Sequence, residues 1–230
     1  MKIKYNNMDI RRKYHLKKFN FNEEEFDFLG LFSQLFGVTD LEHIHEFMGR
    51  FDVFNRAKDQ NTILHKVFYS NFKSRNSSLA VLYERFIRNF ISSIVPESFY
   101  FQKIPTLRVG LPKNKFVGEF HKDTLYNHLP YELNFNLPIV NYKNSAALLT
   151  EDFPGSGNLI SVEIDYGQVM SFDHIDCIHG SNINETEKTM ISLDFRLALK
   201  DFYYEDLAAK SVNTKSYFII GDYFSDEHIN

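Results

Sequence analysis

The spacing of hydrophobic and polar positions changes once along the chain, close to Pro96. Before Pro96, apolar residues recur three and four positions apart, as on the buried face of an α-helix. The clearest such segment runs from about Ser78 to Ile94, where the apolar stripe has no break. After Pro96 the period becomes two, which is typical of strands that bury one face. We therefore expect helices in the first part of the chain and strands in the second.

The first residues carry signals for two more helices behind a basic leader. Met1–Asn20 is rich in Lys and Arg and is interpreted as a solvated leader strand. Asn22 can cap a helix, with Glu25 completing a capping box, and the apolar pattern that follows stops at Gly37. A second capping box at Thr39 predicts another short helix.

The segments with a period of two predict the fold class. They are 100–111, 133–140, 159–164, 168–172 and 191–199, with turn residues between them. Helices followed by many short strands predict an all-β core with added helices (α+β), a double-stranded β-helix or jelly roll with N-terminal helices packed on one face. We expect a single domain with a helical part (1–96), a jelly-roll core (97–200) and an aromatic C-terminal extension (201–230) that packs over the sheet or forms a lid.

Composition narrows the compartment and the kinds of partner. A net charge of −4 and a pI near 6.1 argue against an electrostatic grip on nucleic acid or on an anionic membrane. The single cysteine, Cys177, excludes an intramolecular disulfide and fits a reducing compartment. No apolar run has the length of a signal peptide or a transmembrane helix. We expect a cytoplasmic protein without nucleic-acid or membrane partners, and the oligomeric state stays open.

Three residues carry candidate metal chemistry. His121 and Asp123 lie two apart where a strand runs into a turn, so both side chains can reach one point. His179 follows further along, and two histidines with one carboxylate can hold a metal while leaving its other face open. His174-Ile175-Asp176 repeats the two-residue spacing, but only His228 in the tail follows as a possible second histidine beyond His179.

Several short stretches between Phe99 and Lys200 resemble one known group of enzymes. They are Pro105–Arg108, Val117–Asp123, Glu132–Pro138, Tyr166–Gln168, Phe172–Asp173, His179–Gly180 and Ser192–Arg196, and Gly221–Phe224 in the tail adds another. In this order they resemble the Fe(II)- and 2-oxoglutarate-dependent oxygenases of the jelly-roll (cupin, phytanoyl-CoA hydroxylase-like) superfamily, and most of all its StrG-like bacterial group.

The resemblance implies both a cofactor and a reaction. Fe(II) would be held by His121, Asp123 and His179, with 2-oxoglutarate as cosubstrate and O2 as oxidant. Cosubstrate decarboxylation to succinate and carbon dioxide would accompany oxidation of a C–H bond, usually hydroxylation. The substrate would be a small polar metabolite, such as a sugar or amino-acid derivative in secondary metabolism.

The cation for the far carboxylate of 2-oxoglutarate is where the chain departs from the family pattern. Relatives carry an arginine where this chain has Met190. We favour Arg196, although it lies about 20 Å along the strand from that position, with Arg108 as the alternative and Lys188 as a weaker one. Candidate cosubstrate residues are Arg196, Arg108, Ser192 and Asn134, and candidate substrate residues are Tyr126, Asn127, His128 and Asn136.

Two other functions keep the same fold. One is a metal-dependent isomerase or epimerase of the cupin type, which performs no oxidation. The other is a jelly-roll binding protein without catalysis. The complete set of three ligand residues argues against the second alternative, and release of succinate would separate an oxygenase from both.

Overall fold

The structure is a computed structural model that describes residues 7–48, 62–74, 76–116, 118–211 and 216–230. Val117, which belongs to one of the matching stretches, and the first six residues of the basic leader lie outside the described residues.

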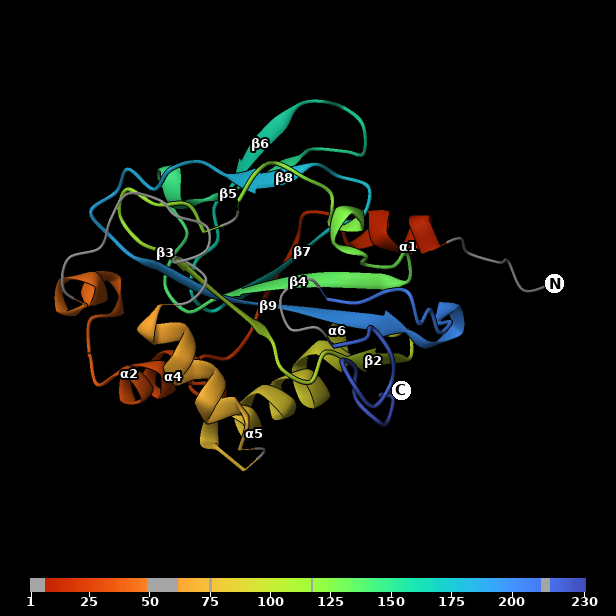
Figure 1. Ribbon diagram of the computed structural model, residues 1–230, viewed down its shortest axis with the longest axis horizontal. Helices are drawn as coiled ribbons and strands as arrows, with labels where there is room; N and C mark the ends of the chain where they lie inside the picture. The colour runs from red at the N-terminus through yellow and green to blue at the C-terminus, as the bar shows by residue number, and fades with distance from the viewer. Residues whose placement is uncertain (1–6, 49–61, 75, 117, 212–215) are drawn as a thin grey trace.

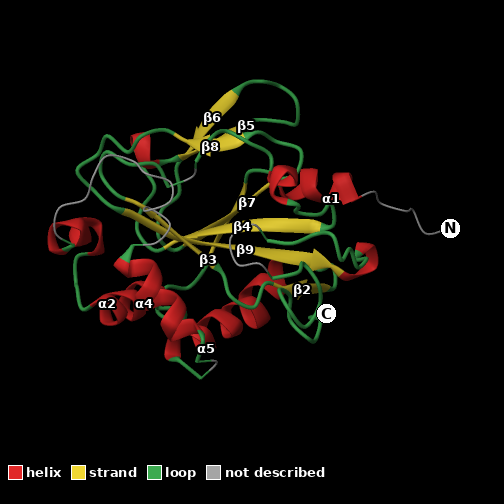
Figure 2. Cartoon of the chain, viewed as in Figure 1, coloured by secondary structure: helices red, strands yellow, loops and turns green. Residues whose placement is uncertain are grey.

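Two antiparallel sheets face each other and form the centre of the fold (Figure 2). In the described residues the larger sheet has the order β1 (Lys17–Asn20), β7 (Gln168–Phe172), β4 (Glu132–Pro138), β9 (Met190–Leu199) and β2 (Phe99–Phe101), and β3 (Thr106–Gly110) also pairs with β9. The smaller sheet has the order β6 (Leu159–Val162), β5 (Leu148–Glu151) and β8 (His179–Ser181). The jelly-roll core with added helices is therefore confirmed.

Helices cover the outer face of the larger sheet (Figure 1). They are α2 (Phe28–Phe36), α4 (Ile63–Phe72), α5 (Ser78–Arg85), the π-helix η2 (Phe86–Ile91) and α6 (Ser92–Ile94). Strand β9 is buried on both faces, so its alternating side chains point into two different buried regions. Leu193 and Phe195 point into the helix-covered core, where Phe195 stacks on Phe135 with 5.5 Å between ring centroids. The opposite row of β9 points between the sheets.

The helix expected over Ser78–Ile94 is confirmed in extent but contains a π-helical segment. Ser77 caps it, accepting a hydrogen bond from the backbone N of Ala80 at 3.2 Å. On its outer face Arg88 binds Glu84 at 2.7 Å, one turn away. Helix α4, which the sequence analysis did not predict, packs beside α5 and α2.

The N-terminal expectations need correction. The leader is a helix, α1 (Asn7–Tyr14), followed by β1, and Arg11 on that helix is buried rather than solvated, because Asp173 and Asp176 pair with it. Asn22 does accept hydrogen bonds, but it caps only a turn. Helix α2 begins after Asp27, whose carboxylate accepts the backbone N–H of Gly30 at 2.7 Å.

Several other boundaries differ from the expectation. The short helix after Thr39 is the 3₁₀ helix η1 (Leu41–Phe47). The segment 100–111 forms two strands rather than one, with Pro105 between them. Strands β5 and β8 were not predicted, and β8 has only three residues, too few to show an alternating pattern. Further 3₁₀ turns are η3 (Asp123–Tyr126), η4 (Asn144–Ala146) and η5 (Lys200–Phe202).

The C-terminal extension packs against the edge of the larger sheet. Phe218 and Phe224 are buried with Tyr131, and Ile229 forms a backbone bridge with Phe99 of β2. In the described parts of the chain, no helix combines the length and the apolar character needed to cross a bilayer.

The aromatic packing between the helices and the larger sheet should contribute strongly to the free energy of unfolding. Phe86 is fully buried, with edge-on contacts to Phe21, Phe26 and Phe28 at 5.2–5.3 Å between centroids. We expect Phe86→Ala to lower the free energy of unfolding by about 3–5 kcal/mol in urea titrations, because it leaves a cavity. Val81→Ala, at a position of α5 that is 53% exposed, is the control and should change it by less than about 0.5 kcal/mol. Equal losses in the two variants would contradict this packing.

Candidate metal centre

A reciprocal backbone bridge brings the two candidate histidine ligands together. The N–H of His121 donates to the carbonyl of His179 at 3.0 Å, and the N–H of His179 donates back at 2.9 Å. Residues paired in this way carry their side chains on the same face, and the two imidazole centroids are 4.6 Å apart. A three-residue strand, β8, therefore fixes a contact between residues far apart in sequence.

The second nitrogen of each ring determines which atom is free to bind a metal. Nδ1 of His121 lies 2.6 Å from the carbonyl of Glu119, and Nδ1 of His179 lies 3.2 Å from the carbonyl of Cys177. A carbonyl only accepts, so both Nδ1 atoms carry the proton and each Nε2 keeps its lone pair. This arrangement is common for metal-binding histidines.

Asp123 completes the group from the start of η3. Its backbone N–H donates to the carbonyl of His174 at 2.8 Å, which holds the turn in place. Its Oδ1 lies 3.2 Å from Nε2 of His121 and 3.3 Å from Nε2 of His179. The three candidate ligand atoms lie within 4.8 Å of one another. Three lone-pair donors facing one point repel each other, so a cation between them makes this arrangement favourable.

The carboxylate of Asp123 is buried but held ionised. Burial alone would raise its pKa, but the charge of Arg196 holds the pKa of Asp123 well below its ordinary value. Nη2 of Arg196 donates to Oδ2 of Asp123 at 2.6 Å. Asp123 is therefore available as an anionic ligand through Oδ1.

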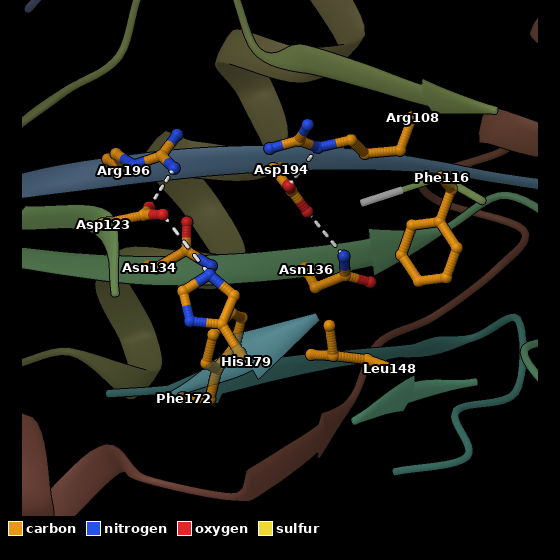
Figure 3. A pocket seen from close by; sticks show the side chains of 10 residues that line it. All are labelled: Arg108, Phe116, Asp123, Asn134, Asn136, Leu148, Phe172, His179, Asp194 and Arg196. Atoms are coloured by element: carbon orange, nitrogen blue, oxygen red, sulfur yellow. Dashed lines mark hydrogen bonds and ion pairs between the residues drawn. The ribbon is translucent and has the colours of Figure 1, made fainter. Parts of the chain in front are cut away.

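A polar pocket extends from this centre between the two sheets (Figure 3). Its lining residues are Arg108, Phe116, Asp123, Asn134, Asn136, Leu148, Phe172, His179, Asp194 and Arg196. Figure 3 shows Arg196 and Asp123 at one end, Arg108 and Phe116 at the other, and Asp194 between the two arginines. The larger sheet supplies the polar wall, and Leu148 of the smaller sheet adds apolar surface.

Arg108 belongs to a short hydrogen-bonded row across the pocket wall. Its Nε donates to Asp194 at 2.7 Å, and Nδ2 of Asn136 donates to the other Asp194 oxygen at 2.5 Å. The Oδ1 atoms of Asn134 and Asn136 are buried without a hydrogen-bond partner in the described residues. Buried amide oxygens without partners are uncommon in folded proteins, and here they belong to side chains of the pocket wall.

The residues considered for the cation that binds the far carboxylate of 2-oxoglutarate lie in different surroundings. Met190 is buried in an apolar cluster, directly opposite Gly110 of β3. Lys188 is exposed and binds Glu42 at 2.6 Å, outside the pocket. Arg196 contacts Asp123 at the metal end, and Arg108 pairs in register with Ser192, one diagonal step from Met190.

The candidate substrate residues of the loop after Asp123 do not line this pocket. Tyr126 packs edge-on against the His121 ring at 4.7 Å. The side-chain amide of Asn127 donates to the carbonyl of Lys210 in the tail, and His128 stacks near Phe218 and binds Glu132 at 2.7 Å. Asn136 does line the pocket. The substrate-binding role of all four residues remains a prediction.

The second His-x-Asp pair does not form a metal site in the described residues. The carboxylate of Asp176 pairs with Arg11 of α1. His174 is fully buried, and burial holds its pKa well below the ordinary value, so the ring is neutral. Cys177 is buried, which raises the pKa of its thiol to about 12, and its carbonyl rather than its sulfur supports His179.

Two functional-site residues were missed by the sequence analysis. Asp194 was not among the candidate site residues, although it binds Arg108 in the pocket wall. Glu132 was not considered at all, although it is a fully buried carboxylate 3.7 Å from Nε of Arg196. The available signal was its place at the start of a hydrophobic strand, on the same side as Asn134 and Asn136.

Comparison with known proteins identifies the family of the chain. No family model matches the sequence. The streptomycin biosynthesis protein StrG of Streptomyces griseus is 30% identical over 194 residues, which cover 84% of this chain and 89% of StrG. The chain belongs to the family of StrG. The alignment spans most of both proteins.

The chain is also similar to solved structures of lower sequence identity. AviO1 from Streptomyces viridochromogenes superposes with a TM-score of 0.51 at 15% identity, covering 87% of this chain and 94% of AviO1. HygX from Streptomyces hygroscopicus, solved with nickel and 2-oxoglutarate bound, has a TM-score of 0.46 at 10% identity, covering 94% of this chain and 95% of HygX. The AviO1 likeness agrees with the jelly-roll architecture.

The geometry predicts one metal ion per chain at the three ligand residues. We expect His121→Ala, Asp123→Ala and His179→Ala each to reduce binding of Fe(II) or Ni(II) below detection by anaerobic calorimetry, because each removes one of the three ligands. Asp176→Asn is the control, since it changes the other His-x-Asp pair and should leave the stoichiometry unchanged. Stoichiometric metal binding by Asp123→Ala would contradict the assignment of the carboxylate.

Proposed function

We propose that the protein is a non-haem oxygenase that uses Fe(II), 2-oxoglutarate and O2 to oxidise a small polar metabolite. One observation carries the proposal. His121, Asp123 and His179 present three lone-pair atoms to one point, at one end of a polar pocket between the sheets. Two histidines and a carboxylate on one side leave other metal positions open, as in non-haem Fe(II) oxygenases.

The donor set suits iron better than a structural metal. It contains two imidazole nitrogens and one carboxylate oxygen and lacks the thiolates of closed structural zinc sites. When bound, the metal with its cosubstrate would supply the oxidising chemistry. The residues of this chain hold the ligands in place, balance the charge of Asp123 and line the pocket beside it.

For the far carboxylate of 2-oxoglutarate we propose Arg108 as the cation, in place of the arginine that relatives carry at the Met190 position. Arg108 lies on the neighbouring strand β3, paired with Ser192, and diagonal neighbours across a strand pair are about 7–8 Å apart. Its guanidinium extends over Asp194 into the pocket (Figure 3). A planar guanidinium can bind a carboxylate through two hydrogen bonds.

Charge supports Arg108 over Arg196 in this role. Arg196 already binds Asp123 at the metal end of the pocket. A five-carbon dicarboxylate that binds the metal at one end needs a cation further away for its other carboxylate. His65, which lies near Arg108, is neutral and is not a competing cation, because burial and the charge of Arg108 lower its pKa to about 4. Burial alone would lower the pKa of Arg108, but Asp194 raises it above its ordinary value, so Arg108 stays charged.

The substrate class follows from the wall of the pocket and from the family. The amide oxygens of Asn134 and Asn136 are buried acceptors without partners in the described residues, and they suit hydroxyl or amino groups. The name of StrG refers to streptomycin biosynthesis, so we propose a small biosynthetic metabolite with several polar groups. Asn134 and Asn136 would orient it or the cosubstrate.

Measurement of succinate tests this function directly. Purified protein with Fe(II), ascorbate and 2-oxoglutarate would be screened against sugars, aminocyclitols and amino-acid derivatives. We expect one class to stimulate succinate release and to gain the mass of an oxygen atom or lose that of two hydrogens. A product of unchanged mass without succinate would indicate the isomerase, and binding without any conversion would indicate a binding protein.

The anchor assignment has its own test. We expect Arg108→Met to weaken 2-oxoglutarate binding to the Ni(II)-loaded protein by about 10- to 100-fold, because a charged hydrogen-bond donor is lost. Metal affinity should stay within about threefold. Lys188→Met is the control, since it removes a surface cation outside the pocket. Normal cosubstrate binding by Arg108→Met would show that another cation serves.

A further inference from the structure

Arg196 lies at the centre of a buried polar network behind the metal centre. It is 4% exposed, and its Nη2 donates to Oδ2 of Asp123, the oxygen that faces away from the two histidines. Oδ1 is the oxygen nearest both Nε2 atoms. The two oxygens of one carboxylate therefore have separate partners.

A second carboxylate balances the charge of Arg196. Glu132 is fully buried, and its Oε2 lies 3.7 Å from Nε of Arg196. Asn134 is directly opposite Arg196 in the strand register, so Glu132 is the diagonal neighbour on the same face. Its oxygens also accept from the N–H of Leu129 at 2.9 Å and from Nδ1 of His128 at 2.7 Å. A buried carboxylate without such partners would be strongly destabilising.

The C-terminal extension places Tyr223 near Arg196. Burial raises the pKa of Tyr223, and the nearby charge of Arg196 opposes that rise. The Tyr223 ring packs edge-on against Phe218 at 4.8 Å and Phe224 at 5.0 Å, so the tail fixes its position. Arg196 thus contacts Asp123 and Glu132 of β4, with Tyr223 of the tail nearby.

We propose that Arg196, supported by Glu132 and Tyr223, is a positioning residue that reserves Oδ1 of Asp123 for the metal. A guanidinium bound to Oδ2 prevents the carboxylate from turning to offer both oxygens. Glu132 and Tyr223 in turn keep the guanidinium from rotating away. The inference rests on the proposed metal site, and it gives Arg196 a role other than cosubstrate binding.

Variants that preserve charge provide the sharpest test. Arg196→Lys keeps the positive charge but removes the planar fork, and Tyr223→Phe removes one hydroxyl without changing charge. We expect each to weaken Co(II) binding, Arg196→Lys by about 10- to 100-fold and Tyr223→Phe by less. We also expect both to change the visible absorption spectrum of the Co(II)-loaded protein, because the Asp123 oxygen would move relative to the metal.

The controls separate positioning from general destabilisation. Arg88→Lys makes the same substitution at an exposed arginine paired with Glu84, and it should leave metal affinity and spectrum unchanged. Tyr223→Phe covers the case in which Arg196→Lys does not fold, and thermal melts of each variant report folding. For the Arg196→Lys protein loaded with metal, 2-oxoglutarate affinity should stay within about threefold.

Two results would overturn the inference. Unchanged Co(II) affinity and spectrum in Tyr223→Phe and in folded Arg196→Lys would show that the network does not position Asp123. Loss of 2-oxoglutarate binding with normal metal affinity in Arg196→Lys would make Arg196 the cosubstrate anchor instead. Failure of the proposed function is distinct from both, because the unmodified protein would then bind no 2-oxoglutarate at all.

Discussion

The structure depends on keeping one carboxylate, Asp123, ionised inside the protein. An isolated buried carboxylate would take up a proton rather than remain charged. The fold avoids this by placing the Arg196 guanidinium against Oδ2, while Oδ1 faces the two histidine Nε2 atoms, where a cation can bind. The interior strand β9, buried on both faces, carries Arg196 to that point. The charge of Asp123 therefore depends on where β9 places Arg196.

The two faces of the larger sheet differ in polarity. The face beneath the helices is filled with aromatic rings such as Phe86, Phe135 and Phe195, which contribute packing without polar atoms. The face between the sheets carries charged and amide side chains, whose burial would be costly without mutual hydrogen bonds. The helices stabilise a fold with such a polar inner face, because they bury apolar surface on the other face of the sheet.

Each buried arginine of the pocket lies beside opposite charge. Asp194 contacts Arg108, and Arg196 lies beside both Asp123 and Glu132, so neither arginine is an isolated cation. The replacement of an expected arginine by Met190 fits this pattern, since Gly110 opposite it leaves room for a side chain and Arg108 on the same strand supplies a cation nearby. A cation thus lies near this end of the pocket, although it is carried by β3 and not by β9 as the family pattern predicts.

By itself, the sequence predicted the fold class and the long helix from Ser78, because periodicity is a local property. The two-residue spacing of His121 and Asp123 offered two candidate ligands, and the resemblance to a known family supported His179 as the third. Tertiary structure alone decided what each buried charge contacts. The reciprocal bridge between His121 and His179, the pairing of Arg108 with Asp194 and the burial of Arg11 and Glu132 join residues far apart in the chain. Such contacts follow from strand register and from how the two sheets pack, which no local pattern encodes.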